Sequence, residues 1–187
     1  DVYKRQILEK MEKNGGGKLE YIWKVKSPLG KMTMASDGEQ LTGLWIAGQK
    51  YYGAALSEKT VEKRLPIFEQ TSLWLERYFA GKRPEIGELS LKPEGTVFRQ
   101  QVWKILCEIP YGETITYGEI AKRLEKELKI RMSAQAVGGA VGHNPISVII
   151  PCHRVIGSDG SLIGYAGGIE LKRRLLVHEG VILNTQK

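Results

Sequence analysis

Cysteine and histidine are scarce in this 187-residue chain, and their scarcity excludes several kinds of protein. There are two cysteines, Cys107 and Cys152, and three histidines, with no cluster at the spacing of a zinc site. A lone disulfide is not expected in a non-secreted chain of this size. We therefore expect two reduced thiols and no structural metal.

Long apolar runs are also missing. No stretch approaches the ~20 apolar residues that a membrane helix needs, and residues 1–18 contain no apolar signal core. We therefore expect a soluble, cytoplasmic protein with a disordered leader over residues 1–18 and a short tail over 184–187. A hydrophobic content of 42% with four tryptophans is enough for a packed core.

Acidic residues are outnumbered by basic ones. The chain has 21 Asp and Glu against 28 Lys and Arg, a net charge of +7. Such an excess is compatible with a polyanionic partner, although surface lysines alone also produce it. Charge therefore permits nucleic acid binding without identifying it.

Residues 19–92 predict a supporting α+β domain without a reactive constellation. Apolar residues alternate from Leu19 to Ile46 between turns at 27–30 and 36–38, which predicts an antiparallel meander. The spacing becomes helical over 68–79, where an apolar stripe is expected in the core: Leu73, Trp74, Tyr78 and Phe79. Residues 87–95 are interpreted as a linker.

Three short helices are predicted in a second domain over residues 93–183. Thr96 caps the first, Thr116 begins a capping box for the second, and Ser133 caps the third, a run of small residues over 134–141. Glycines inside a helix cost up to ~1 kcal/mol each relative to alanine. The third helix therefore indicates either tight helix packing or, as the second helix of a helix-turn-helix, close approach to a nucleic acid backbone.

The most reactive stretch is Pro151-Cys152-His153-Arg154-Val155. Branched apolar residues over 146–150 predict a buried strand that the proline ends, which places Cys152 at the end of a rigid element. A Cys-His neighbour pair alone is weak evidence, because free cysteine more often packs than reacts. Cys107 lies in a helical apolar pattern and is interpreted as packing.

Several motifs nevertheless occur in a recognisable order: Asn144-Pro145, Ile150-Pro151-Cys152-His153-Arg154-Val155, Gly164-Tyr165-Ala166-Gly167-Gly168 and His178-Glu179-Gly180. With them, residues 96–180 closely resemble the O6-alkylguanine-DNA alkyltransferases. The resemblance implies an α+β fold in which a ribonuclease-H-like antiparallel sheet domain precedes a winged helix-turn-helix alkyltransferase domain.

The resemblance also implies the activity, that of a methylated-DNA–protein-cysteine S-methyltransferase. Such a protein repairs double-stranded DNA carrying an alkyl group on guanine O6 or, more weakly, thymine O4, after flipping the nucleotide out of the duplex. The alkyl group passes irreversibly to Cys152, so each molecule acts once. A monomer with no cofactor, no protein partner and no membrane association is expected.

Four catalytic residues follow from the resemblance. Only a thiolate is an effective nucleophile, and a thiol with an ordinary pKa of ~8.5 is mostly protonated at neutral pH. His153 is expected to take the proton of Cys152, directly or through water, while Glu179 orients the imidazole. Tyr117 matches the tyrosine whose hydroxyl assists departure of the guanine.

The substrate pocket is implied in the same way. The backbone of Val155 is expected to read the purine, Tyr165 to flank it and the Ala166 amide to face O6. Gly167 keeps the pocket wall low. Asn144 is expected to tie the neighbouring backbone together through hydrogen bonds.

The expected DNA-binding residues lie at the start of the small-residue helix: Ser133, Ala134, Gln135, Ala136 and Gly138. Many members of the family carry an arginine near this helix start, where this chain has Gln135. Glutamine lacks the charge and the fork geometry of arginine. We therefore expect capture of an extrahelical base to be less favourable in this chain.

Two other functions compete with this interpretation. A sensor of alkylated DNA or a winged-helix regulator would bind without transfer chemistry, but such sensors lack the reactive cysteine and Cys152 is present. A thiol hydrolase is disfavoured because adjacent residues on an extended strand point apart.

Overall fold

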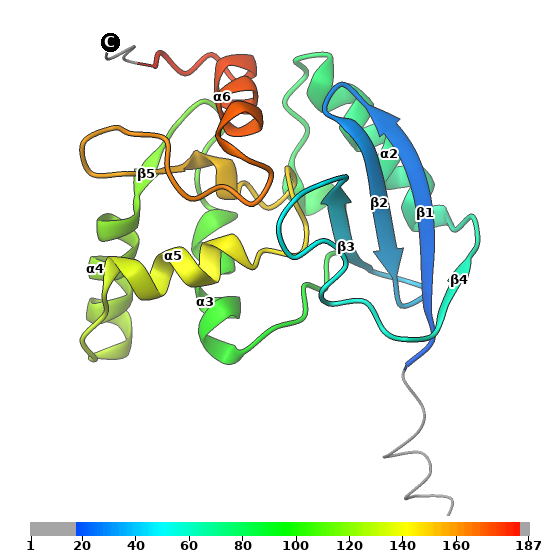
Figure 1. Ribbon diagram of the computed structural model, residues 1–187, viewed down its shortest axis with the longest axis horizontal. Helices are drawn as coiled ribbons and strands as arrows, with labels where there is room; N and C mark the ends of the chain where they lie inside the picture. Colours follow the sequence, from blue (N-terminus) through cyan, green and yellow to red (C-terminus); the bar gives the residue numbers. More distant parts are fainter. Residues whose placement is uncertain (1–17, 184–187) are drawn as a thin grey trace, which may run out of the picture.

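A computed structural model describes residues 18–183, and the expected leader, apart from Lys18, and the tail lie outside this range. A twisted sheet with one helix forms the first half of the chain, and a group of short helices forms the second half beside it (Figure 1). The predicted α+β class is confirmed.

The sheet has the strand order β3-β2-β1-β4. The antiparallel meander is confirmed as β1 (Glu20–Ser27), β2 (Gly30–Ser36) and β3 (Leu41–Ile46). A fourth strand, β4 (Thr60–Glu62), pairs parallel with β1 at the edge. The sequence pattern missed β4 because its three residues are all exposed and carry no alternation.

Helix α2 (Pro66–Phe79) follows the sheet, and proline at its start suits a position that needs no N–H donor. Its buried face includes Trp74, Leu75 and Tyr78. The prediction that Leu73 lies in the core is wrong, since Leu73 is 58% exposed. Successive residues are about 100° apart around a helix, so Leu73 lies beside Trp74 on the side away from Leu75.

The predicted linker packs against the sheet. It contains a short 3-10 turn, η1 (Ile86–Glu88). The Leu41 amide then donates to Ser90 O at 2.9 Å, and the Lys92 amide donates to Leu41 O at 2.8 Å. The linker thereby runs along the outer edge of β3.

The three predicted helices of the second half are present as α3 (Val97–Leu106), α4 (Tyr117–Leu128) and α5 (Ala134–Gly142). Their predicted caps form, and the reciprocal capping box at Thr116 is complete. None of the helices within residues 18–183 is long and apolar enough to cross a membrane.

A two-stranded parallel sheet organises the rest of this half. β5 (Ile115–Thr116), directly before α4, pairs with β6 (Val155–Ile156), and α6 (Ile169–His178) follows. The two halves meet at β3, where the Leu44 amide donates to Pro145 O at 2.8 Å. The segment after Pro145 is therefore held against the sheet of the first half.

Candidate active site

The predicted strand over residues 146–150 is absent. These residues are buried, but they form consecutive turns, and a single bridge joins Ile146 to Leu44. The prediction was wrong because a short apolar run is equally typical of any buried segment, and periodicity alone does not separate the cases. Cys152 instead begins a 3-10 helix, η2 (Cys152–Arg154).

Two tight turns lead into η2. The Ile149 amide donates to Ser147 O at 2.9 Å, which closes a turn at Val148. The Cys152 amide donates to Ile150 O at 2.8 Å and closes a turn at Pro151. Both are γ-turns, and Val148 has a φ of 71°. A β-branched residue with positive φ is strained by about 1–3 kcal/mol, and such strain concentrates at functional sites.

The Cys152 thiol is buried and hydrogen-bonded. Asn144 Nδ2 donates to its sulfur at 3.1 Å and to Ile150 O at 2.8 Å, while Asn144 Oδ1 accepts from the Ile146 amide at 3.0 Å. Burial raises the pKa of Cys152, and the Asn144 hydrogen bond and the Lys172 ammonium act against that rise. The thiol is therefore protonated at neutral pH, and its ionisation needs a base.

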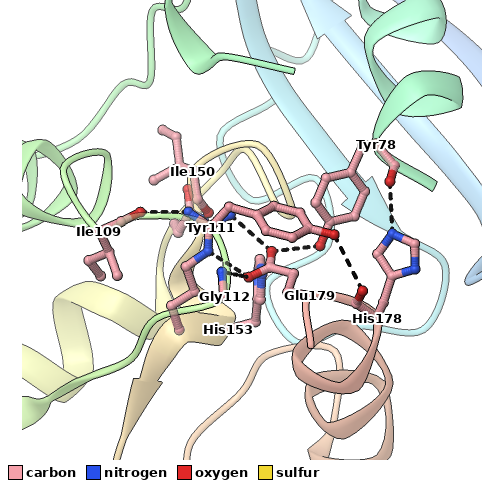
Figure 2. Close-up of polar contacts among 10 residues, drawn as sticks. Tyr78, Ile109, Tyr111, Gly112, Ile150, His153, His178 and Glu179 are labelled. Atoms are coloured by element: carbon pink, nitrogen blue, oxygen red, sulfur yellow. Dashed lines mark hydrogen bonds and ion pairs between the residues drawn. The ribbon is translucent and has the colours of Figure 1, made fainter. Parts of the chain in front are cut away.

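His153 has the geometry of that base. Its ring is fully buried, and Nε2 lies 2.7 Å from Glu179 Oε1 (Figure 2). Burial lowers the pKa of His153, so the ring is neutral at pH 7. Because a carboxylate only accepts, Nε2 carries the proton. Nδ1 is then a free acceptor, and it has no hydrogen-bond partner within the described chain.

Glu179, at the C-terminal end of α6, gathers several donors. Arg154 donates through Nε to Oε2 at 2.8 Å and through Nη2 to Oε1 at 2.9 Å. Tyr78 Oη donates to Oε1 at 2.8 Å, and the Gly112 amide donates to Oε2 at 3.3 Å (Figure 2). Burial opposes ionisation of Glu179, but the hydrogen bonds from His153 and Arg154 outweigh it and hold its pKa well below the usual range. The carboxylate is therefore a fixed anion.

Tyr117 is engaged with the loop that follows β6. Its hydroxyl donates to Ile163 O at 2.8 Å, and burial raises its pKa to about 12. Lys172 Nζ donates to the same carbonyl at 2.8 Å and also to Val155 O. Burial lowers the pKa of Lys172 to about 8. Both side chains therefore anchor the loop at Ile163.

The sequence interpretation missed three of these residues: Tyr78, Arg154 and Lys172. A signal existed for Lys172, because it lies three and four residues before Leu175 and Leu176 on the apolar face of α6. The other two carried no such signal, since their partners are distant in the chain.

The expected pocket residues lie on β6 and the loop after it. Val155 is buried in β6, and the Tyr165 hydroxyl is buried without a hydrogen-bond partner in the described part of the chain. Ala166 O accepts from the Lys50 amide at 2.8 Å. A methyl group on Gly167 would lie 2.8 Å from the Tyr165 ring, so this position has no room for a side chain.

Four of the five expected DNA-binding residues lie on an open surface, and the fifth, Gly138, faces Tyr117 of the site. Residues 133–136 are exposed at the start of α5, and Ser133 Oγ accepts from the Ala136 amide at 3.0 Å. Gly138 faces the Tyr117 ring, and a Cβ atom added to it would lie 3.8 Å from that ring. A Cβ atom added to Gly139 would point into open space. The helix packs through Val137, Ala140 and Val141 and leaves its first turn and Gly139 exposed.

Comparisons with known proteins agree on one family. Residues 21–93 match 6-O-methylguanine DNA methyltransferase, ribonuclease-like domain, and residues 97–181 match 6-O-methylguanine DNA methyltransferase, DNA binding domain. A methylated-DNA–protein-cysteine methyltransferase of Haemophilus influenzae is 46% identical over 155 residues, 83% of each chain. Its namesake in Methanosarcina barkeri is 46% identical over 153 residues, 81% of this chain and 92% of the relative. The crystal structure of Mycobacterium tuberculosis OGT in complex with DNA is 42% identical, with a TM-score of 0.75, over 86% of this chain and 93% of that one.

Proposed function

Because the chain belongs to the 6-O-methylguanine DNA methyltransferase family, we propose that it reverses alkylation of guanine O6 in double-stranded DNA by moving the alkyl group to Cys152. The relatives' names and the DNA complex of the mycobacterial protein support this activity. The observation that carries the assignment is the neutral, buried His153, which directly follows Cys152 in η2, is fixed on Glu179 through Nε2 and has no hydrogen-bond partner for Nδ1 within the described chain.

The reaction is a displacement at the alkyl carbon. His153 takes the Cys152 proton, directly or through water, and the thiolate attacks the carbon bound to O6. A bond forms between sulfur and carbon as the carbon–O6 bond breaks. The products are a thioether on the protein and an unmodified guanine, which receives one proton in exchange for the alkyl group.

Tyr117 is the proposed donor to the departing purine. A phenol whose pKa is about 12 keeps its proton at neutral pH and is suited to donate a hydrogen bond. Its hydroxyl now donates to Ile163 O. When the substrate binds, the Tyr117 hydroxyl therefore has to leave Ile163 O or be shared between Ile163 O and the purine.

The target nucleotide has to leave the duplex to reach Cys152, a residue that is only 4% exposed. The open face of α5 is the proposed contact with the DNA. Gln135 would lie near the place in the duplex that the flipped nucleotide has left. The exposed N-terminal end of this helix suits a phosphate. We place this action in the cytoplasm, where a prokaryotic chromosome lies, on the support of the prokaryotic relatives.

A direct test uses an oligonucleotide duplex containing O6-methylguanine. Intact mass spectrometry should show a gain of one methyl group by the wild-type protein, at most one equivalent per molecule. The Cys152→Ala variant should gain none, and Cys107→Ala, which removes the other thiol, should behave as wild type. An unmodified wild-type mass, or repeated turnover, would refute the proposal.

A further inference from the structure

Tyr78 connects the first domain with the proposed relay. We propose that Tyr78 is a positioning residue for alkyl transfer, because it holds the Glu179 carboxylate in the orientation that fixes His153. This inference rests on the proposed role of His153 and Glu179 in activating Cys152. It gives the ribonuclease-like half of the chain a part in the chemistry, through Glu179 and His153.

The contacts are short and shared. Tyr78 Oη donates to Glu179 Oε1 at 2.8 Å, and the same oxygen accepts from His153 Nε2 at 2.7 Å. The carbonyl of Tyr78 also accepts a hydrogen bond from His178 Nε2 at 2.7 Å. Two successive residues at the end of α6 are thereby anchored to one residue of α2 (Figure 2).

The phenol is itself held firmly. Tyr78 is 1% exposed, and its ring stacks on Trp74 with the centroids 5.6 Å apart and an interplanar angle of 7°. Tyr111 meets it edge-on at 6.0 Å. Trp74 is in turn fixed by its indole N–H, which donates to Glu85 O at 2.8 Å. A donor ordered during folding requires no reorganisation during the reaction.

Arg154 already supplies the positive charge that keeps Glu179 ionised, so Tyr78 has a different role. As a neutral donor it adds a contact from the first domain and restricts rotation of the carboxylate. It also uses part of the acceptor capacity of Oε1. A carboxylate with an additional donor is a weaker acceptor for His153, and the imidazole consequently stays neutral to lower pH.

The test compares Tyr78→Phe, which keeps the ring, with Tyr52→Phe. Tyr52 is 44% exposed, and its hydroxyl is hydrogen-bonded to Thr33 Oγ1. For Tyr78→Phe, single-turnover transfer at saturating DNA should slow about tenfold, the loss expected for one hydrogen bond to a charged acceptor. The acidic limb of its pH–rate profile should move to higher pH, and duplex affinity should stay at the wild-type value. Tyr52→Phe should match wild type in all three measurements.

Two further measurements separate positioning from folding. Tyr78→Phe should have little additional effect on transfer in a Glu179→Gln background, since the proposed partner is already altered. If Tyr78→Phe does not fold, 3-fluorotyrosine at position 78 keeps the hydroxyl as a stronger donor, and the acidic limb should then move to lower pH.

The outcomes separate this inference from the proposed relay. If Glu179→Gln transfers at the wild-type rate, the relay itself fails. If Glu179→Gln is slow, but Tyr78→Phe or the fluorotyrosine protein has wild-type rate and pH dependence, only the role of Tyr78 is overturned.

Discussion

The side-chain amide of Asn144 lies 3.1 Å from the sulfur of Cys152. The proposed alkyl acceptor is therefore hydrogen-bonded before substrate arrives. Donation to sulfur favours the thiolate, and the same amide also fixes the turn through Ile150 O at 2.8 Å. The Asn144 side chain thus fixes the backbone turn and favours ionisation of the Cys152 thiol.

Asn144→Asp tests this double role with little change of shape. A carboxylate cannot donate to the sulfur or to Ile150 O, and its charge opposes formation of the thiolate. Transfer should slow by more than about tenfold, and the free energy of unfolding should fall by about 2 kcal/mol. Ser147→Ala is the control, because it removes the hydrogen bond to Gln49 without touching sulfur. A wild-type transfer rate for Asn144→Asp, in single-turnover assays alongside urea unfolding, would contradict the role.

Acid should destabilise the protein in part through Glu179. The pKa of Glu179 in the folded protein lies below the ordinary value of ~4.3. Its contribution to the free energy of unfolding is therefore complete above pH ~4.3 and is lost as the pH falls below that value. Urea unfolding from pH 7 to 3 should show a shallower acid dependence for Glu179→Gln. That variant should also be less stable at pH 7 by about 3 kcal/mol, since Arg154 loses its charged partner. Glu69→Gln, at an exposed carboxylate, should keep the wild-type dependence.

Alkyl transfer should tolerate mild acid. Burial holds the pKa of His153 below its ordinary value of ~6.5, and the base works only in its neutral form. The single-turnover rate at saturating DNA should therefore change little from pH 8 to about 6.5 and fall only in more acidic solution. A midpoint at or above that value, with DNA binding unchanged over the range, would show that His153 is not the titrating base.

Gln135→Arg should tighten binding to alkylated duplex. Arginine adds a charge and a planar fork at the exposed start of α5, and a base-edge contact of this kind contributes about 1–3 kcal/mol. We expect about tenfold higher affinity in titrations at one fixed salt concentration. Gln70→Arg adds the same charge to the exposed surface of α2 and should have a much smaller effect. Equal affinities for the two variants would leave Gln135 without a specific role.

Local features were predictable from the sequence, and long-range ones were not. The capping box at Thr116 and the cap at Ser133 were predicted correctly because their partners lie within one helical turn. The apolar run over 146–150 predicts a strand but forms turns, because buried turns and buried strands are equally apolar. Tyr78 lies 101 residues from Glu179 in the chain, so only the folded structure brings them together.

Five N–H and O–H groups converge on the Glu179 carboxylate, from α2, the turn at Gly112 and η2. In an enzyme that turns over, a site locked this firmly would have to reopen to release product, a step that often limits the rate. A protein that keeps the alkyl group on its own sulfur releases the repaired DNA once and never has to clear the site for a second substrate. Its supply is then set by synthesis of new chains, and rigidity in the spent molecule carries no kinetic penalty.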